Sequence, residues 1–279
     1  MEKSANIFCF KRFDVINVRS AMKVNTDGVL LGALMTMLPS DHRILDIGTG
    51  TGTIALMAAQ RLVDMCSAES NFCMSDRSIT PCSSGASHAD IASAVETASA
   101  VTAIHAIDID EPSATEAAEN FRNSPWSDIL HAHHLSIDEF AAGLRAETFD
   151  LICSNPPYFD NALQAPEHRR NAARHTSTGL SYREILDFSS LRLSSEGRVA
   201  MVLPAATEHD LTRHARMSGL YLYKITRIRT VPRKAPKLIV AEFSRSRTED
   251  PVDTILTIQD GGKYTDEYLA VTKDFYLFA

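Results

Sequence analysis

The stretch Arg43–Arg61 restricts the possible folds of this 279-residue chain more than any other. Arg43–Ile47 is a short apolar run of the kind that forms a buried strand, and Thr53–Arg61 has the apolar spacing of a helix. Between them lies Asp-Ile-Gly-Thr-Gly-Thr-Gly, which begins at Asp46. Alternate glycines allow a tight turn and a backbone that a ligand can approach closely. A strand, a glycine-rich turn and a helix in this order predict an α/β fold with a ligand site at the turn.

The residue types in this turn indicate which ligand it binds. A dinucleotide-binding turn places pyrophosphate on the helix N-terminus. Here the carboxylate of Asp46 would repel a phosphate and favour a cationic amino-acid moiety. This chemistry points to S-adenosylmethionine, whose ammonium and sulfonium are both positive. The predicted cofactor contacts in the turn are Asp46, Gly48, Gly50 and Gly52.

Two further strands are expected to bring polar residues to the same edge of the sheet. Val101–Asp110 predicts a second strand that ends in acids, and Asp108 is expected to accept both ribose hydroxyls of a nucleoside. A third strand is expected at Ile129–Leu135. The loop after it should face the cofactor adenine, with Ser136 or Asp138 in contact with that ring.

The fourth predicted strand leads into the turn Ser154-Asn155-Pro156-Pro157-Tyr158. Two consecutive prolines fix φ and remove two backbone donors, so the chain must leave the sheet there. A planar amine could donate one hydrogen bond to the Asn155 side-chain oxygen and one to the Pro156 carbonyl, with Tyr158 stacked on the ring. The alternative is an Asn-Pro turn that merely ends a strand. The predicted catalytic residues are Asn155, Pro156, Pro157 and Tyr158, and Asn155 is also a predicted cofactor contact.

The segment before the glycine-rich turn predicts a helix. Thr26 or Asp27 can cap it, and the apolar run that follows must be buried. Residues 1–40 are expected to cover the cofactor, with Lys23, Thr26 and Asp27 among the contacts. The alternative makes Thr26 and Asp27 a helix cap alone.

The rest of the chain completes one domain, residues 1–279. The predicted fold is α/β and Rossmann-like: a mostly parallel, seven-stranded sheet with helices on both faces and a basic antiparallel hairpin at residues 220–247. Residues 64–100 are rich in Ser and Ala with little periodicity, which predicts a surface insertion. Cys66, Cys73 and Cys82 fit no standard ligand spacing there, so no metal site is expected.

The net charge of −7 does not exclude a nucleic acid as partner, because the position of charge matters more than its sum. Residues 211–247 carry ten Lys or Arg against one acid, Glu242, and a second basic group follows Tyr158. Both groups are expected to contact RNA phosphates, and the alternative is a solvated charged face. The predicted RNA contacts are Arg169, Arg170, Arg174, His175, Arg227, Arg229, Arg233, Lys234 and Lys237.

The amino-acid composition indicates where in the cell the protein is expected to act. No run approaches the roughly 18 apolar residues that a membrane span needs, and the N-terminus lacks a signal-peptide pattern. Five cysteines without any CxxC favour a reducing compartment. A cytoplasmic protein that acts as a monomer, with no membrane or protein partner, is expected.

Together these motifs resemble class I S-adenosylmethionine-dependent methyltransferases, in which the Asn-Pro-Pro-Tyr form belongs to enzymes that act on planar amide or exocyclic amine nitrogens. More narrowly, the chain resembles the bacterial valine-tRNA adenine-N6 methyltransferase family. That resemblance implies methylation of N6 of the adenine 3′ of the anticodon. It rests on Met22–Ala33, Leu45–Gly52, Ser124–Trp126, Ser154–Phe159, Ala173–Thr176, Tyr264–Tyr268 and Lys273–Leu277.

The chain departs from the family pattern in two places. Ser136 stands where the family normally has an acid after the third strand, and residues 64–100 form a longer segment than usual. These departures bear on cofactor affinity and loop contacts, not on the reaction class.

Three rival functions are disfavoured. A protein-glutamine N5 methyltransferase usually has a helical domain before the glycine turn, but only 45 residues precede Asp46. A DNA adenine methyltransferase would need a separate target-recognition domain, and no segment is large enough. A non-catalytic RNA-binding protein with a relic cofactor fold is disfavoured by the complete set of Asp46, Gly48, Gly50, Asp108 and Asn155.

Overall fold

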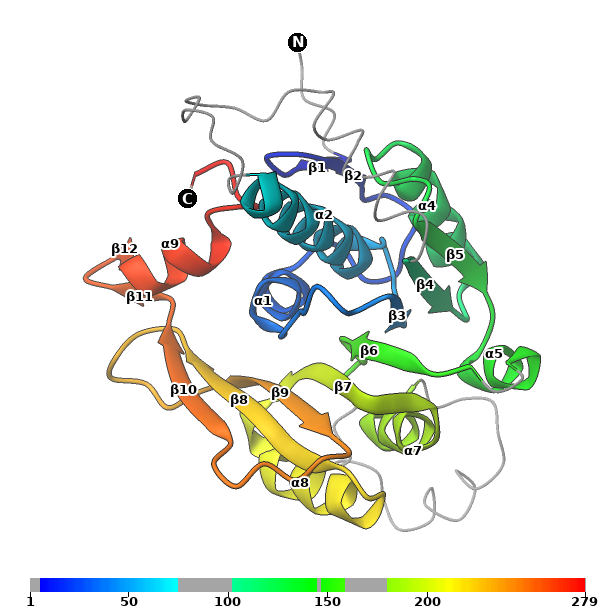
Figure 1. The fold of residues 1–279 in the computed structure, drawn as a ribbon. Helices are drawn as coiled ribbons and strands as arrows, with labels where there is room; N and C mark the ends of the chain where they lie inside the picture. Colours follow the sequence, from blue (N-terminus) through cyan, green and yellow to red (C-terminus); the bar gives the residue numbers. More distant parts are fainter. Residues whose placement is uncertain (1–5, 75–101, 145–146, 159–179, 279) are drawn as a thin grey trace.

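An eight-stranded sheet forms the centre of the molecule (Figure 1). The computed structural model describes residues 6–74, 102–144, 147–158 and 180–278. The spatial order of the strands is β10-β8-β9-β7-β6-β3-β4-β5. Their bounds are β3 Arg43–Ile47, β4 Ala103–Asp108, β5 Leu130–His134, β6 Phe149–Ser154, β7 Leu193–Pro204, β8 Tyr221–Arg229, β9 Leu238–Ser244 and β10 Val252–Thr257.

Seven of the eight strands of this sheet run in one direction, and β9 alone is antiparallel to its neighbours β7 and β8. The expected count of seven was therefore one too low. The eighth strand is β10, which pairs in parallel with β8 from Val252↔Lys224 to Thr257↔Arg229. Parallel pairing has no short-turn signature in a sequence, because it needs a crossover connection.

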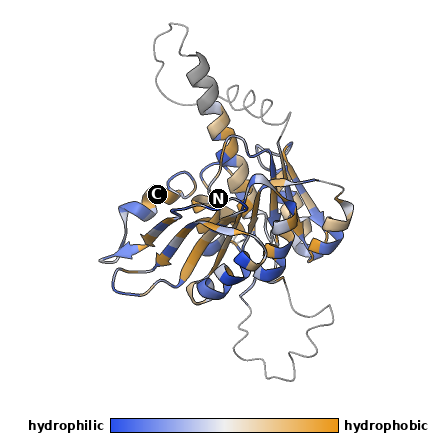
Figure 2. Cartoon of the chain, turned by 60° about the horizontal axis from the view of Figure 1, so that its bottom comes forward, coloured by the Kyte–Doolittle hydropathy of each residue, from blue (hydrophilic) through white to orange (hydrophobic). Residues whose placement is uncertain are grey.

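Helices cover both faces of the sheet (Figure 1). One face carries α1, α2, α4 and α9 and the other carries α5, α7 and α8, as their apolar residues fall into two separate core clusters. The bounds are α1 Thr26–Leu34, α2 Thr53–Met74, α4 Glu111–Arg122, α5 Ile137–Gly143, α7 Tyr182–Arg192, α8 Glu208–Met217 and α9 Asp266–Thr272. The apolar residues concentrate on the strands and the polar ones on the outer faces of the helices (Figure 2).

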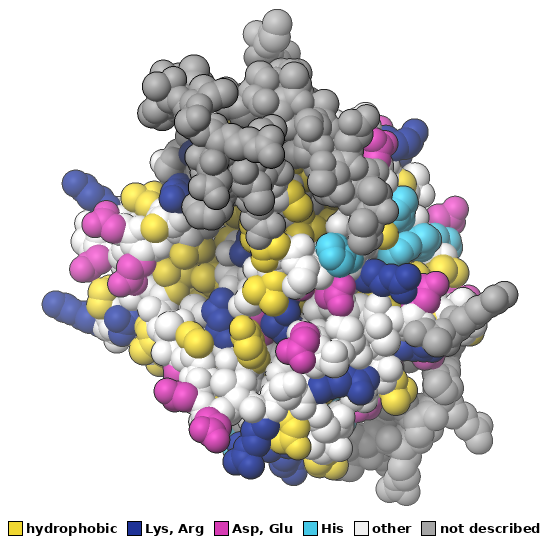
Figure 3. All heavy atoms as spheres, in the orientation of Figure 1, with side chains coloured by type: hydrophobic (Ala, Val, Ile, Leu, Met, Phe, Trp, Pro, Cys, Tyr) yellow, Lys and Arg dark blue, Asp and Glu magenta, His cyan; other side chains and the backbone are white. Residues whose placement is uncertain are grey.

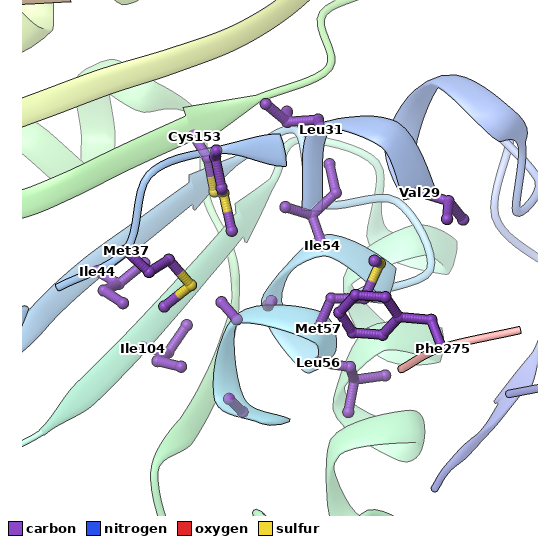
Figure 4. Close-up of a cluster of buried hydrophobic side chains, with 14 of the residues drawn as sticks. Val29, Leu31, Met37, Ile44, Ile54, Leu56, Met57, Ile104, Cys153 and Phe275 are labelled. Carbon is purple, nitrogen blue, oxygen red and sulfur yellow. The ribbon is translucent and has the colours of Figure 1, made fainter. Parts of the chain in front are cut away.

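The α1–α2 contact shows why the N-terminal helix is apolar around its circumference. Val29, Leu30 and Leu31 are buried against α2 and the sheet. Gly32 allows the helices to approach closely, because a Cβ there would lie 2.7 Å from the Met57 sulfur. Figure 4 shows Met57 and Ile54 from α2 within this cluster. The packing fixes the start of α1 close to the glycine-rich turn.

Short hairpins lie near both termini. The strands β1 Ile7–Cys9 and β2 Asp14–Ile16 form an antiparallel hairpin, and β11 Gln259–Asp260 pairs with β12 Lys263–Tyr264. The Lys11 amide donates to the Phe275 carbonyl at 2.8 Å, which joins the two terminal regions. Within the described parts of the chain, no helix is long and apolar enough to cross a membrane.

Local structure differs from the sequence prediction in three places. The cap of α1 is Asn25, whose side chain accepts from the Gly28 amide at 2.8 Å, and not Thr26 or Asp27. The expected loop from residue 64 begins later, because α2 continues to Met74. The expected loop after the third strand is the helix α5, since Ser136 and Glu139 form a capping box.

Candidate active site

The glycine-rich turn between β3 and α2 lies at the carboxyl edge of the sheet. Gly48, Gly50 and Gly52 all have positive φ, from 58° to 82°, a conformation that residues with a Cβ rarely adopt. The amides of Gly48 and Thr49 both donate to the Ile107 carbonyl at the end of β4, at 2.9 and 3.0 Å. The turn is therefore fixed to the neighbouring strand.

The third glycine of the turn has a different role from the first two. A Cβ on Gly52 would lie 2.5 Å from Cε1 of Phe121 in α4. The residues that line the adjacent cavity include Gly48 and Gly50 but not Gly52. Gly52 is therefore needed for helix packing, and its contact with the cofactor stays a prediction.

Asp108 ends β4 beside this turn, as expected. One of its carboxylate oxygens accepts from the Gly50 amide at 2.9 Å and the other from the Asp110 amide at 2.9 Å. Burial is the largest effect on its pKa and raises it, while the two amide hydrogen bonds oppose that shift. Each oxygen keeps a lone pair for a further donor.

Asp46 is fully buried beneath the turn. Its carboxylate accepts from the Thr49 hydroxyl at 2.7 Å, and the Cys153 sulfur lies 3.8 Å from its other oxygen. Burial raises the pKa of Asp46 to about 7, and the nearby charge of Asp108 adds to the shift. Asp46 therefore stabilises the conformation of the turn directly and can change protonation near neutral pH.

Residues 16–25, which we call the cover segment, pass over the turn. The Glu116 carboxylate, buried in α4, accepts from the amides of Val18, Arg19 and Ser20 at 2.8, 2.5 and 3.1 Å. Asn120, one helical turn later, bonds both the amide and the carbonyl of Ile16. The cover segment is therefore held to α4 along its first half.

Asn120 also links the cover segment to the glycine-rich turn, because its side-chain amide donates to the Thr51 carbonyl at 2.8 Å. The Lys23 ammonium donates to the Val18 carbonyl at 2.5 Å, and Lys23, a predicted cofactor contact, also lines the cavity beside the turn. Sequence reasoning missed Glu116 and Asn120. The sequence does mark them, because they are two polar residues four positions apart on a helix face that should be buried.

A small cavity lies between the cover segment and the turn. Its lining includes Met22, Asn25, Gly28, Gly48, Gly50 and Asn155. The cavity holds about 30 Å³, room for no more than about two water molecules. A larger ligand therefore requires some of this lining to move outward.

The residues around this cavity fit S-adenosylmethionine. Gly48 and Gly50 present backbone without side chains, and the Thr49, Thr51 and Thr53 residues add hydroxyl-bearing side chains to the lining. Asp108 offers carboxylate oxygens within a hydrogen bond of the Gly50 amide. The Asp108 carboxylate suits the ribose hydroxyls and the open turn suits the amino-acid part, whereas Asp46 is fully buried beneath the turn and does not line the cavity.

The predicted catalytic turn borders the same cavity. The Ser154 hydroxyl donates to the Ile47 carbonyl at 2.7 Å, which fixes the end of β6 against β3. Asn155 is 7% exposed, and its side-chain NH₂ lies 3.5 Å from the Met22 sulfur. Its side-chain oxygen lies 3.4 Å from the Tyr158 hydroxyl.

Tyr158 connects the catalytic turn to the start of α1. Its hydroxyl donates to the Asp27 carboxylate at 3.0 Å. Burial raises the pKa of Asp27, although the hydrogen bond from Tyr158 opposes the shift. Burial and the Asp27 charge raise the pKa of Tyr158, so the hydroxyl stays protonated as a donor. The structure thus brings Asp27 to the catalytic turn, where the sequence had assigned it to the cofactor.

Four other predicted site residues are not part of the cavity lining. Thr26 is exposed at the first position of α1, and the Ser136 hydroxyl bonds Glu139 within its capping box. Pro156 is buried and Pro157 half-buried after Asn155. In the described residues, no group of three His, Cys, Asp or Glu could hold a metal ion. Cys82 and the side chain of Cys73 lie outside the described residues.

The predicted RNA contacts divide into three sets. Arg227 bonds the carboxylates of Glu208 and Asp253, and Arg229 bonds the Thr257 hydroxyl and the Pro232 carbonyl. The remaining hairpin residues, Arg233, Lys234 and Lys237, are exposed. The predicted contacts that follow Tyr158 lie outside the described residues: Arg169, Arg170, Arg174 and His175.

Comparisons with known proteins agree with this geometry. A family model described as an RMKL-like methyltransferase domain matches residues 33–229. The chain is 35% identical over 271 residues to a tRNA1(Val) (adenine(37)-N6)-methyltransferase of Flavobacterium psychrophilum, covering 97% of this chain and 99% of that protein. A protein of the same description from Photobacterium profundum is 34% identical, covering 97% of this chain and 98% of that one.

Solved structures share the fold at low sequence identity. A predicted O-methyltransferase from Agrobacterium tumefaciens superposes with a TM-score of 0.56 and 15% identity, covering 89% of this chain and 96% of that chain. A methyltransferase from Pyrococcus furiosus gives a TM-score of 0.50 and 18% identity, with 83% and 89% covered. The central sheet and its helices are therefore those of a Rossmann-like methyltransferase.

Proposed function

The chain belongs to the tRNA1(Val) (adenine(37)-N6)-methyltransferase family, and we propose that it methylates N6 of an adenine in tRNA with S-adenosylmethionine as donor. The observation that carries the assignment is the position of Asn155. The sequence Asn-Pro-Pro-Tyr leaves the sheet at the end of β6, and the Asn155 side chain borders the cavity of the glycine-rich turn. A methyl acceptor and a methyl donor can meet there.

Cofactor binding is assigned to the residues around the glycine-rich turn. Asp108 would accept the ribose hydroxyls, and the open backbone of Gly48 and Gly50 would lie against the amino-acid portion. Asp46 would supply a buried negative charge near the ammonium. When bound, the cofactor supplies an electrophilic methyl group. Contacts from Lys23, Thr26 and Ser136 remain predictions.

Catalysis is assigned to the turn after β6. The exocyclic amine of adenine is a weak nucleophile because its lone pair is delocalised into the ring. Hydrogen bonds from that amine to the Asn155 side-chain oxygen and the Pro156 carbonyl would favour a pyramidal nitrogen, with its lone pair directed out of the ring plane. Such groups stabilise charge that develops in the transition state and align the reacting atoms.

The adenine must leave its stack to reach this turn, as bases do in other base-modifying enzymes. Tyr158 is 42% exposed, and its ring is available to stack on the base. Stacking of a base on an aromatic ring offsets part of the cost of unstacking, by about 1–3 kcal/mol.

Docking of tRNA is assigned to the carboxyl edge of the sheet. The tip of the β8–β9 hairpin lies at this edge, because Leu238 pairs with Pro204 at the end of β7 and the Ala205 amide bonds the Lys237 carbonyl at 2.8 Å. Arg233, Lys234 and Lys237 therefore face the side of the molecule that carries Asn155. We expect Arg227 to contribute less to tRNA binding, since the carboxylates of Asp253 and Glu208 already bind it.

A hollow along α8 begins at this edge with Ala205 and reaches the far end of the helix at Met217. Its volume is about 770 Å³, and its lining includes Ala205, Glu208, His209, Arg213, Arg216 and Met217. Lys and Arg side chains gather at the lower border of the molecule, over α8 (Figure 3). These side chains would bind RNA phosphates without recognising the base sequence. We further propose that the protein is a monomer and acts in the cytoplasm.

The proposed function is tested by methyl transfer into tRNA from a strain that lacks the gene, with nucleoside analysis by mass spectrometry. The wild-type protein should form N6-methyladenine. Asn155→Ala should lose roughly 3 kcal/mol of transition-state stabilisation, or about 150-fold in kcat, as when an oxyanion donor is removed. Asn123→Ala, at the carboxyl end of α4, is the matched control. No N6-methyladenine from the wild type would contradict the function, and a normal rate for Asn155→Ala would contradict the mechanism.

A further inference from the structure

We propose that Asp27 is a catalytic residue: its carboxylate accepts a hydrogen bond from the target N6 amine and takes up the proton that the amine loses. The inference rests on the proposed function and deepens it. In the structure the Tyr158 hydroxyl lies between the Asp27 and Asn155 side chains, in the place that we assign to the amine of adenine.

The helix α1 sets the position of Asp27, and the Asp27 side chain is not needed to cap that helix. Asn25 is the cap, and its side chain accepts from the Gly28 amide at 2.8 Å. Gly28 is buried next to Asn155, with the site of a Cβ only 3.8 Å from the Asn155 side-chain nitrogen. The first turn of α1 therefore lies directly against the catalytic turn, and the Asp27 carboxylate is free to face it.

Two acceptors from different elements converge on one donor. The Tyr158 hydroxyl lies 3.0 Å from an Asp27 carboxylate oxygen and 3.4 Å from the Asn155 side-chain oxygen. A hydroxyl has only one hydrogen to share between them, whereas an exocyclic amine has two. An adenine amine in the same place can give one hydrogen to the Asn155 oxygen and share the other between the Pro156 carbonyl and the Asp27 carboxylate. Tyr158 would then give up these bonds as its ring stacks on the base.

A carboxylate at this place suits the charge changes of the reaction. The N6 lone pair forms the new bond to the methyl carbon, and the bond from that carbon to sulfur breaks with its electron pair left on sulfur. The nitrogen then carries a positive charge and two hydrogens. One proton passes to the Asp27 carboxylate and later to solvent, and the neutral N6-methyl amine remains. Burial raises the pKa of Asp27, which favours its role as acceptor.

The test compares Asp27→Asn, Asp27→Glu and the control Asp266→Asn. Asp266 is an exposed carboxylate in the first turn of α9, so its substitution matches the change in charge and helix position. For each variant, kcat and KM for tRNA are measured, together with the Kd of S-adenosylmethionine by calorimetry and the thermal unfolding midpoint.

We expect Asp27→Asn to lower kcat by about 100-fold, as expected for loss of a general base, with the cofactor Kd and the unfolding midpoint close to wild type. Asp27→Glu should recover part of the lost rate, and Asp266→Asn should match the wild type. A weaker cofactor Kd with normal kcat in Asp27→Asn would make Asp27 a cofactor ligand and overturn the proposal. A normal kcat and Kd in that variant would also overturn it, while the function stands. No methyl transfer by the wild type would overturn the function itself.

Discussion

The Asp108 carboxylate accepts a hydrogen bond from the Gly50 amide at 2.9 Å, so the second strand of the site is joined to the glycine-rich turn before any ligand binds. The bond holds both groups at a spacing set by the sheet. Since β3 and β4 pair in register from Arg43↔Ala103 to Ile47↔Ile107, the turn and the carboxylate belong to one rigid unit.

Asp108→Asn should weaken cofactor binding about 10- to 100-fold, because hydrogen bonds to a charged group are worth roughly 1.5–3 kcal/mol. The amide retains one oxygen but cannot accept both ribose hydroxyls. Calorimetric titration with S-adenosylmethionine measures the change, and Asp128→Asn, an exposed carboxylate after α4, is the control. An unchanged Kd in Asp108→Asn would remove Asp108 from the cofactor site.

The stability of the protein should depend on pH through Asp46. Burial raises its pKa to about 7 in the folded state from an ordinary 3.8. Between these values the folded state binds a proton that the unfolded chain has released, so the free energy of unfolding falls as pH rises from about 4 to about 7. The slope from this one group is at most about 1.4 kcal/mol per pH unit.

The contribution of Asp46 is measured by urea unfolding of the wild type and Asp46→Asn at several values of pH within that window. The difference in unfolding free energy between the two proteins should change steadily with pH, because the amide does not titrate. Parallel curves would show that Asp46 is not the group responsible. Asp128→Asn should track the wild type.

Gly52→Ala should destabilise the protein more than Gly219→Ala. Both glycines have positive φ, 82° and 78°, but a Cβ meets Phe121 at 2.5 Å in the first case and nothing within 4 Å in the second. Left-handed strain costs about 1–2 kcal/mol, and overpacking adds about 1–3 kcal/mol. Urea unfolding should therefore give the larger loss for Gly52→Ala by at least about 1 kcal/mol, and equal losses would refute the packing role.

Charge reversal at the hairpin tip should weaken tRNA binding. The double variant Arg233→Glu, Lys234→Glu should lower the slope of log Kd against log salt by about 2, one for each phosphate that the protein no longer neutralises. The control is Arg43→Glu, Arg122→Glu, at the start of β3 and the end of α4, which lie on the opposite edge of the sheet. Equal effects of the two variants would indicate a solvated charged face at the hairpin.

The strands of the site were predictable because each is a short, apolar run with polar residues at its end. Asp108 and Asn155 lie at the carboxyl ends of β4 and β6, as expected from that pattern. Burial on both faces of a parallel sheet leaves a continuous apolar signal in sequence. The edge strand β10 carries a weaker signal, since Val252 and Ile255 are about half exposed.

The contacts between distant segments could not be predicted in the same way. Glu116 binds backbone amides of the cover segment nearly a hundred residues earlier in the chain, and no local propensity encodes such a pair. The role of Gly52 depends on where Phe121 packs. The hydrogen bond between Asp27 and Tyr158 likewise depends on the approach of α1 to β6, which only the assembled core determines.

The anchoring of the cover segment has a kinetic consequence. Glu116 holds it at residues 18–20, and the Val24 amide bonds the Asn17 side chain at 3.1 Å, so hydrogen bonds must break wherever it moves aside for the donor to enter or leave. A tRNA seated on the carboxyl edge, as proposed, would lie over this segment. The arrangement therefore implies an ordered scheme, in which the donor binds before tRNA and its demethylated product departs after tRNA, with this exchange as a step that can limit turnover.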